Sequence, residues 1–191
     1  MEAVLRGRDR GVVAVDLAGD EIAYPGRLFT RHFQQARESG MRITVHAGES
    51  TSAAQVKQAI VELGAERIGH GIRAVDDPAV MDLVARAGVG LENCLSTNVQ
   101  CGLVSSFAEH PLPVFLRRGL SVTLNTDCTT ISGSDLNSEY RLAAEELVLS
   151  EEELNLLRLN AVRVAFLTDE ERADLTRKMF VGDLGGVADP A

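Results

Sequence analysis

The stretch MRITVHAGESTS, from Met41 to Ser52, begins with a β-branched apolar run and ends in polar residues. A short apolar run of this kind is typical of a buried strand, and a helix-like segment follows it. His46 and Glu49 stand at the end of the run, separated by an Ala-Gly pair that lets the backbone turn tightly. The stretch therefore predicts a βα unit with an imidazole and a carboxylate at the carboxyl end of its strand.

The same kind of unit recurs along the chain without being a sequence repeat. Four further apolar runs end in polar residues: GVVAVDLAGDE (11–21), ERIGHG (66–71), GVGLENC (88–94) and LSVTLNTDC (120–128). Runs that are apolar throughout are typical of parallel strands buried on both faces. The helical segments between the first four runs are predicted to end at Gly40, Gly64 and Gly88. This alternation predicts an α/β fold with right-handed crossovers.

Two architectures are compatible with five βα units. A doubly wound sheet carries a glycine-rich phosphate turn after an early strand, and the sequence has no GxGxxG or Walker motif. A (β/α)₈ barrel of the TIM type places its chemistry at the carboxyl ends of its strands. Polar residues stand at that end of every run: Asp16, His46, His70, Asn93 and Asp127. A complete barrel needs about 250 residues, so we expect about five βα units from the C-terminal part of a barrel.

The part of the chain after Asp127 is predicted to be mostly helical. Ser150 with Glu153, and Thr168 with Glu171, have the spacing of capping boxes. We see no internal linker and expect one partial barrel domain over residues 1–180. The glycine-rich residues 181–191 are expected to form a flexible tail.

Composition and charge narrow the class of protein. The net charge of −9 argues against nucleic acid or an anionic membrane surface as the partner, but does not exclude an uncharged nucleoside. No apolar run approaches the roughly 20 residues that span a bilayer, and the first residues do not resemble a signal peptide. Three cysteines without a CxxC pair indicate reduced thiols, so a cytoplasmic location is expected.

Four residues at strand ends have side chains suited to catalysis or metal binding. His46 could bind a divalent metal, with Glu49 as an acid or base beside it. His70 lies in GHG, where the flanking glycines allow a ligand to approach closely. Asp127 could complete a metal site. Each residue alone also fits a structural role, as a hydrogen-bonded histidine or a helix cap, but a barrel brings strand ends together around one mouth.

Other polar residues favour structural interpretations. Asp20 and Glu21 fit a pair at the start of a helix. His32 lies within a helical pattern and His110 precedes Pro111 in a loop, so both are expected to be structural or exposed. Cys128 stays ambiguous, because a thiol beside a metal ligand could bind metal or substrate, yet buried cysteine is usually a small apolar residue.

Five short motifs together resemble the adenosine deaminase family. DLAGDE, TVHAGE, RIGHG, LSTN and LNTD occur in that family's order and approximate spacing, and LNAVRVAFLTDEERADL resembles its C-terminal helices. The resemblance runs from Gly11 to Met179. It implies a zinc hydrolase in a (β/α)₈ barrel that replaces the 6-amino group of adenosine with oxygen.

The resemblance also implies a role for individual residues. His46 and Asp127 match zinc ligands of the family. Glu49 matches the acid that protonates the purine N1, and His70 matches the histidine that orients the zinc-bound water and helps to deprotonate it. Gly19 matches a backbone contact to the purine ring.

Two departures from the family pattern qualify these expectations. The family carries an HxH motif on its first strand that supplies two more zinc ligands, and no HxH occurs in these 191 residues. Cys128 stands where the family usually has a second aspartate, thought to hold the purine N7. We therefore expect an incomplete zinc ligand set, little activity of this chain alone, and a 6-aminopurine substrate that need not be adenosine.

Two other functions remain open from the sequence. One is a truncated, non-catalytic homologue that acts as a binding or interaction subunit, because unpaired sheet edges would favour self-association. The other is a different metal-dependent barrel hydrolase that acts on other amides or amines.

Overall fold

The computed structural model describes residues 2–181. Five strands form one sheet in which every neighbouring pair is parallel. The strands are β1 (Ala14–Leu17), β2 (Arg42–Ala47), β3 (Arg67–His70), β4 (Gly90–Asn93) and β5 (Ser121–Leu124). Each corresponds to one of the five apolar runs, so the predicted α/β fold is confirmed.

The order of the strands in the sheet follows their order in the chain, β1-β2-β3-β4-β5. A doubly wound sheet would reverse direction at a switch point, whereas consecutive parallel strands are the arrangement of a (β/α)₈ barrel. The register places His46 opposite Gly69 and Ala47 opposite His70. The ends of β2 and β3 therefore bring the two histidines of the sequence motifs side by side.

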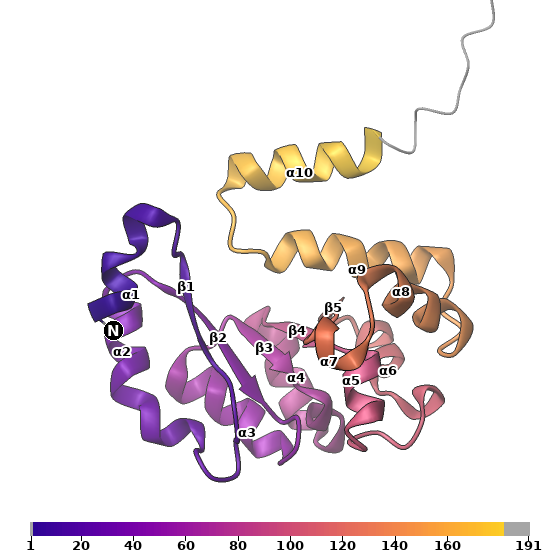
Figure 1. The fold of residues 1–191 in the computed structure, drawn as a ribbon, viewed down its shortest axis with the longest axis horizontal. Coiled ribbons are helices and arrows are strands. Elements are labelled where there is room, and N and C mark those ends of the chain that lie inside the picture. Colours follow the sequence, from indigo (N-terminus) through magenta and orange to yellow (C-terminus); the bar gives the residue numbers. More distant parts are fainter. Residues whose placement is uncertain (1, 182–191) are drawn as a thin grey trace, which may run out of the picture.

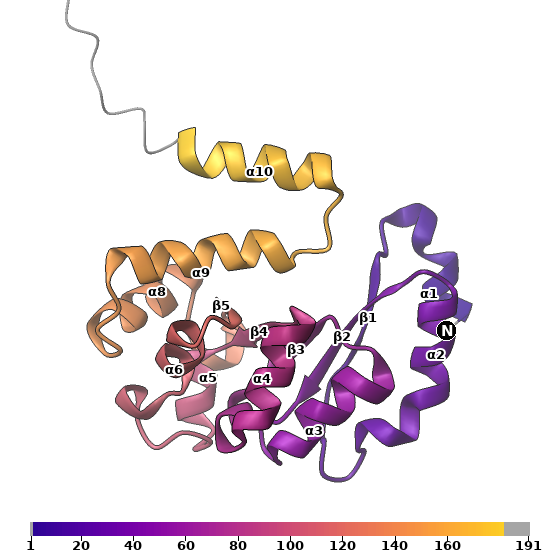
Figure 2. The ribbon, with the colours of Figure 1, turned by 180° about the vertical axis from the view of Figure 1, so that it is seen from behind.

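Helices cover one face of the sheet, and the other face is open over β1 to β3 (Figures 1 and 2). The connecting helices are α2 (Thr30–Glu38), α3 (Ala53–Gln58), α4 (Pro78–Ala87), α5 (Leu95–Gln100) and α6 (Leu112–Arg117). Shorter helical turns accompany them: α1 (Glu2–Arg6), η1 (Arg8–Arg10), η2 (Gly26–Phe29), η4 (Ile72–Asp76) and η5 (Phe107–Glu109).

The two faces of the sheet differ in chemistry. Side chains that point toward the helices are buried and apolar, as are Ile43, Val45, Ile68, Leu91 and Val122. The open face carries polar side chains that contact one another: Asp16 with His46, and Arg67 with Thr44 and Glu92. Our expectation of strands that are apolar on both faces is therefore wrong for the open face, because that face presents the side chains of the candidate site.

The helix ends agree with the sequence signals. Residues Gly40, Gly64 and Gly88 adopt left-handed backbone conformations after α2, η3 (Ala59–Leu63) and α4. Asp77 caps α4 by accepting from the Ala79 N–H at 2.9 Å. One local feature differs from a plain helix: α3 continues as a π-helical turn, η3 (Ala59–Leu63), before it ends.

The C-terminal region is helical, as predicted. It contains α7 (Thr129–Ser132), α8 (Leu136–Glu145), α9 (Glu151–Val164) and α10 (Asp169–Val181). Both predicted capping boxes form, at Ser150 with Glu153 and at Thr168 with Glu171. Helix α9 packs against β5, where Asn160 Nδ2 donates to the Val122 carbonyl at 3.0 Å. Val181 is the last residue of α10, and the rest of the expected tail, 182–191, lies outside the described residues.

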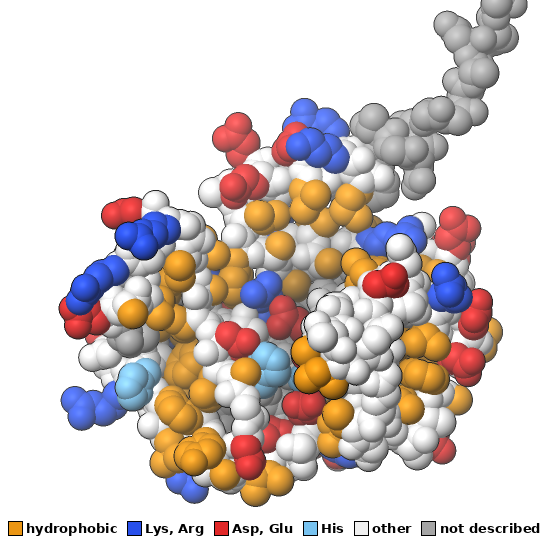
Figure 3. Space-filling view, in the orientation of Figure 1, with side chains coloured by type: hydrophobic (Ala, Val, Ile, Leu, Met, Phe, Trp, Pro, Cys, Tyr) orange, Lys and Arg blue, Asp and Glu red, His pale blue; other side chains and the backbone are white. Residues whose placement is uncertain are grey.

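The open face of the molecule is hollowed at its centre (Figure 3). A histidine and several acidic side chains gather in the hollow between the N-terminal elements and α7–α8, with apolar side chains beside them. None of the helices described for residues 2–181 has the length and apolar character needed to cross a membrane. The three cysteines are free thiols; Cys94 is buried, and Cys101 and Cys128 are exposed.

Candidate functional site

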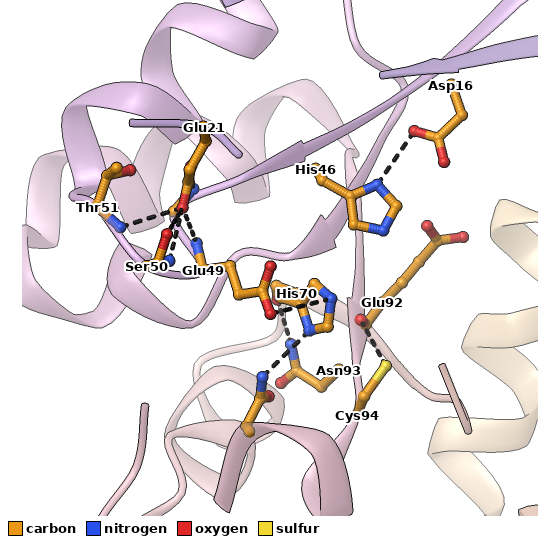
Figure 4. A network of polar contacts seen from close by, with 12 residues as sticks. Asp16, Glu21, His46, Glu49, Ser50, Thr51, His70, Glu92, Asn93 and Cys94 are labelled. Atoms are coloured by element: carbon orange, nitrogen blue, oxygen red, sulfur yellow. Dashed lines mark hydrogen bonds and ion pairs between the residues drawn. The ribbon is translucent and has the colours of Figure 1, made fainter. Parts of the chain in front are cut away.

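The imidazole of His46 lies at the carboxyl end of β2 and contacts a carboxylate on the neighbouring strand. His46 Nδ1 is 3.2 Å from Asp16 Oδ1 (Figure 4). This hydrogen bond to Asp16 raises the pKa of His46, although burial works in the opposite direction. A Cβ atom at Gly69 would lie 2.8 Å from the His46 ring, so only glycine at this position of β3 leaves room for the ring.

A carboxylate that binds the other ring nitrogen is a common support for a metal-binding histidine. With Nδ1 on Asp16, His46 keeps Nε2 available as a ligand atom. The sequence places Asp16 at a strand end but does not predict that it pairs with His46. The parallel register places Asp16 of β1 beside Thr44 of β2. His46 is two residues after Thr44, so its side chain lies on the same face of the sheet as that of Asp16.

The loop that carries Glu49 is held by a second carboxylate, that of Glu21. Glu21 accepts hydrogen bonds from the backbone N–H groups of four successive residues, 48 to 51, and from the Ser50 hydroxyl. Figure 4 shows these contacts converging on the Glu21 side chain. Glu21 was interpreted as part of a helix start; instead it fixes the loop after β2 to the loop after β1.

His70 ends β3 in a backbone conformation that is unusual for a residue with a side chain. Its φ angle is 59°, and Gly71 follows with φ 64°. The Asn93 side chain donates to the His70 carbonyl and helps to hold this left-handed turn. The side chain of His70 is 3% exposed, and burial lowers its pKa to about 4. The ring is therefore neutral at pH 7.

Glu49 and His70 form a close pair at the strand ends. His70 Nε2 lies 3.6 Å from Glu49 Oε1, and the ring centroids of His70 and His46 are 5.4 Å apart. Burial raises the pKa of Glu49, and the charge of Asp127 acts in the same direction. A carboxyl group with a raised pKa keeps its proton to higher pH, which suits a general acid.

Behind His70 lies a buried polar network that the sequence does not predict. His70 Nδ1 is 3.1 Å from Asn98 Nδ2, and Asn98 Oδ1 is 3.1 Å from His110 Nε2. His110 is 3% exposed, and burial lowers its pKa to about 3. Of the two alternatives expected for His110, structural or exposed, the structural one holds, whereas His32 is exposed on α2. The LSTN motif contained the only sequence signal for this network, at Asn98.

The other predicted residues surround this centre. Gly19 lines a pocket of about 380 Å³ that His46 also lines, together with Glu21, Tyr24 and Phe29. Asp127 follows β5 with φ 56° and an exposed side chain, within electrostatic range of Glu49 and His70. Cys128 is exposed at the start of α7.

These residues supply only part of a metal centre. A catalytic zinc site has at least three protein ligands, and the expected ligands in this chain are His46 and Asp127. Within residues 2–181, no group of three or more His, Cys, Asp and Glu side chains is arranged to hold a metal ion. The described residues therefore do not fit a zinc ion by themselves.

Comparisons with known proteins agree with the fold and the motifs. The family model described as adenosine deaminase matches residues 1–180. The adenosine deaminase of Erwinia tasmaniensis is 46% identical over 179 residues, which cover 94% of this chain and 54% of that relative. That of Klebsiella pneumoniae is 47% identical over 180 residues, covering 94% of this chain and 54% of the relative.

A solved structure has the same fold. The adenine deaminase of Arthrobacter aurescens superposes with a TM-score of 0.83 at 31% identity, covering 91% of this chain and 55% of that chain. The chain thus spans about half the length of the relatives it matches.

Proposed function

The chain belongs to the adenosine deaminase family, and from this premise we propose that it forms part of a zinc hydrolase that deaminates adenosine or a related 6-aminopurine nucleoside. The observation that carries the proposal is the convergence of Glu49, His70 and His46 at neighbouring strand ends on the open face of the sheet. A barrel enzyme of this family acts on its substrate at that end of its strands.

Glu49 is the proton donor in the proposed reaction. Hydrolysis at C6 of a purine requires that the ring become electrophilic, and protonation at N1 achieves this. Burial raises the pKa of Glu49, so its carboxyl keeps the proton to higher pH than an exposed glutamate does. The Glu21 hydrogen bonds fix the loop, so the acid is held in place before the substrate binds.

His70 and Gly19 position the reactants. The neutral His70 ring faces the same space as Glu49 and orients the attacking water. The backbone at Gly19, in a pocket shared with His46, contacts the purine ring. Both assignments follow the family motifs GHG and DLAGD, at the positions where this chain matches them.

His46 and Asp127 are proposed as two zinc ligands, with the others supplied from outside these 191 residues. Support comes from the Asp16–His46 contact, which leaves His46 Nε2 free and orients the ring. A zinc ion held by these two residues and by ligands from outside the chain would supply an activated water. Because two ligands are too few, we propose that this chain alone is inactive and binds zinc weakly.

The identity of the substrate depends on Cys128. A thiol is a weaker hydrogen-bond partner than a carboxylate, so Cys128 would hold a purine nitrogen less well than an aspartate would. The related structures include an adenine deaminase and an N6-mAMP deaminase of arabidopsis, the latter 28% identical with a TM-score of 0.84 over 95% of this chain and 53% of that one. We therefore propose a 6-aminopurine compound as the substrate class. A cytoplasmic location fits free thiols and a purine substrate.

The test joins this chain to the N-terminal half of the Erwinia tasmaniensis adenosine deaminase. The zinc-loaded chimera is assayed for loss of absorbance with adenosine, adenine and N6-methyl-AMP. We expect the chimera to deaminate at least one of these compounds. Glu49→Gln should lower the deamination rate by at least about 100-fold. Glu62→Gln, a control at an exposed residue of the outer helix layer, should leave the rate unchanged. A folded, zinc-loaded chimera that deaminates none of these compounds would overturn the proposal.

A second proposal is favoured by the exposed apolar residues around β1: the chain acts as a non-catalytic interaction subunit. Val13, Ile22 and Tyr24 are 54%, 71% and 63% exposed. A monomeric chain that holds one zinc ion per molecule would contradict this second function, and metal analysis with light scattering distinguishes the two.

A further inference from the structure

A directional chain of hydrogen bonds leads from the backbone of α6 to His70. The Leu112 N–H donates to His110 Nδ1 at 3.1 Å, and His110 Nε2 lies 3.1 Å from Asn98 Oδ1. Asn98 Nδ2 lies 3.1 Å from His70 Nδ1. His70, Asn98 and His110 are all buried, with exposures of 3%, 0% and 3%. Water therefore does not compete for these contacts.

The first link fixes the tautomer of His110. A backbone N–H can only donate, so His110 Nδ1 must be an unprotonated acceptor. A neutral imidazole carries one proton, which then lies on Nε2. His110 Nε2–H consequently donates to Asn98.

The second link fixes the orientation of the Asn98 amide. If the amide were flipped, its NH₂ group would face His110 Nε2, and that ring would have to accept at both nitrogens. A neutral or protonated imidazole cannot do so. The carbonyl of Asn98 therefore faces His110, and its NH₂ group donates to His70 Nδ1.

We infer that Asn98 and His110 are positioning residues that lock His70 in the tautomer with its proton on Nε2. The ring then presents an N–H donor to the open face of the sheet rather than a lone pair. In terms of the proposed function, on which this consequence rests, neutral His70 donates to an oxygen in the site and does not accept a proton at Nε2.

Nuclear magnetic resonance of the imidazole nitrogens tests the inference directly. Long-range ¹H–¹⁵N correlations of the metal-free, substrate-free 191-residue chain at pH 7.5 distinguish protonated from unprotonated ring nitrogens. The chain has four histidines, and exposed His32 serves as an internal reference for a tautomer mixture. We expect unprotonated Nδ1 and protonated Nε2 in both His70 and His110.

A variant adds a prediction that a merely structural role would not produce. Asn98→Asp replaces the NH₂ donor with an acceptor oxygen of almost the same shape. We expect His70 Nδ1 to become protonated, while His110 keeps its tautomer. Asn137→Asp, the same change at an exposed residue near the start of α8, is expected to leave all four histidines unchanged.

Three outcomes would overturn the inference: a protonated Nδ1 in wild-type His70, a mixture like that of His32, or an unprotonated Nδ1 in a folded Asn98→Asp variant. If that variant does not fold, the wild-type spectrum alone decides. The measurement involves neither zinc nor substrate. A failed deamination assay therefore leaves it intact, and a wrong tautomer leaves the proposed reaction class intact.

Discussion

His110 carries no charge in the folded protein, because its buried ring accepts the Leu112 N–H at Nδ1. Protonation would place an N–H against that N–H, so the folded state binds this proton far more weakly than the unfolded chain does. Burial of the ring lowers the pKa of His110 from its ordinary value of 6.5 to about 3, and nearby His70 acts in the same direction. Between these two values the unfolded state binds more protons, and stability rises with pH.

We predict that the stability contributed by neutral His110 is fully present above about pH 6.5 and is lost as the pH falls toward 3. At pH 5 the contribution of His110 to this loss is about 2 kcal/mol. In His110→Gln, which cannot titrate, the difference in unfolding free energy between pH 7.5 and pH 5 should shrink by up to that amount. Urea unfolding at both pH values measures it.

The matched control is His32→Gln, the same substitution at an exposed histidine of α2. We expect its pH dependence to equal that of the wild type. An unchanged pH dependence in His110→Gln would show that the His110 ring is not held in its neutral form by this contact.

Candidate site residues were predictable where the neighbouring sequence alone marks them. His46, Glu49 and His70 could be selected because each ends an apolar run, and the structure brings them together. Their catalytic roles stay predictions. His110 was not selected, because its significance depends on Asn98, which is twelve positions away and reaches it only through the fold.

At the scale of elements, the hydrogen bonds between Glu21 and the loop after β2 contribute most to the geometry of the site. One side chain satisfies four successive backbone N–H groups, which would otherwise need water or another partner. The loops after β1 and β2 are thereby joined, and Glu49 lies within the joined segment.

We predict that Glu21→Gln destabilises the chain by about 1–3 kcal/mol, because one acceptor oxygen becomes an NH₂ group facing N–H donors. Hydrogen exchange at the amides of residues 48 to 51 should accelerate more than exchange in β3. Glu38→Gln, at an exposed end of α2 where Glu38 accepts from Gln34, is the control and should change neither property. Unaltered exchange at residues 48 to 51 in Glu21→Gln would contradict this role.

The elements themselves were largely predictable, and their long-range connections were not. All five strands and the helix ends at Gly40, Gly64 and Gly88 follow from apolar runs and glycine positions. The π-helical turn at 59–63 has no distinct sequence signal, since its apolar spacing fits an α-helix equally well. The role of Glu21 was misread because its partners lie 27 to 30 positions later.

For the whole molecule, the exposed apolar residues beside β1 are the feature that we expect to affect self-association in solution most. β1 is an edge strand among the described residues, and Val12 and Val13, which precede it directly, are 39% and 54% exposed. Edge strands with apolar surroundings favour association with another chain. The net charge of −9 opposes this only in part.

We predict that the 191-residue chain self-associates with rising concentration and that Val13→Lys reduces this association. A lysine at a strand edge disfavours pairing with a second edge. Val61→Lys is the control, since Val61 is 60% exposed on the outer helix layer and the charge change is the same. Light scattering over a concentration series measures the effect. A monomeric wild type at every concentration, or equal effects of both substitutions, would contradict the prediction.

The sheet order β1-β2-β3-β4-β5 also has a consequence for how the chain folds and evolves. Among residues 2–181, every strand pairs with the strand next to it in the sequence, so none of these pairings has to wait for a distant segment to be made. Assembly can therefore proceed unit by unit, with each βα unit using its predecessor as a template. For the same reason, units can be added at either edge of such a sheet without disturbing the pairings already formed, much as modules extend a repeat protein.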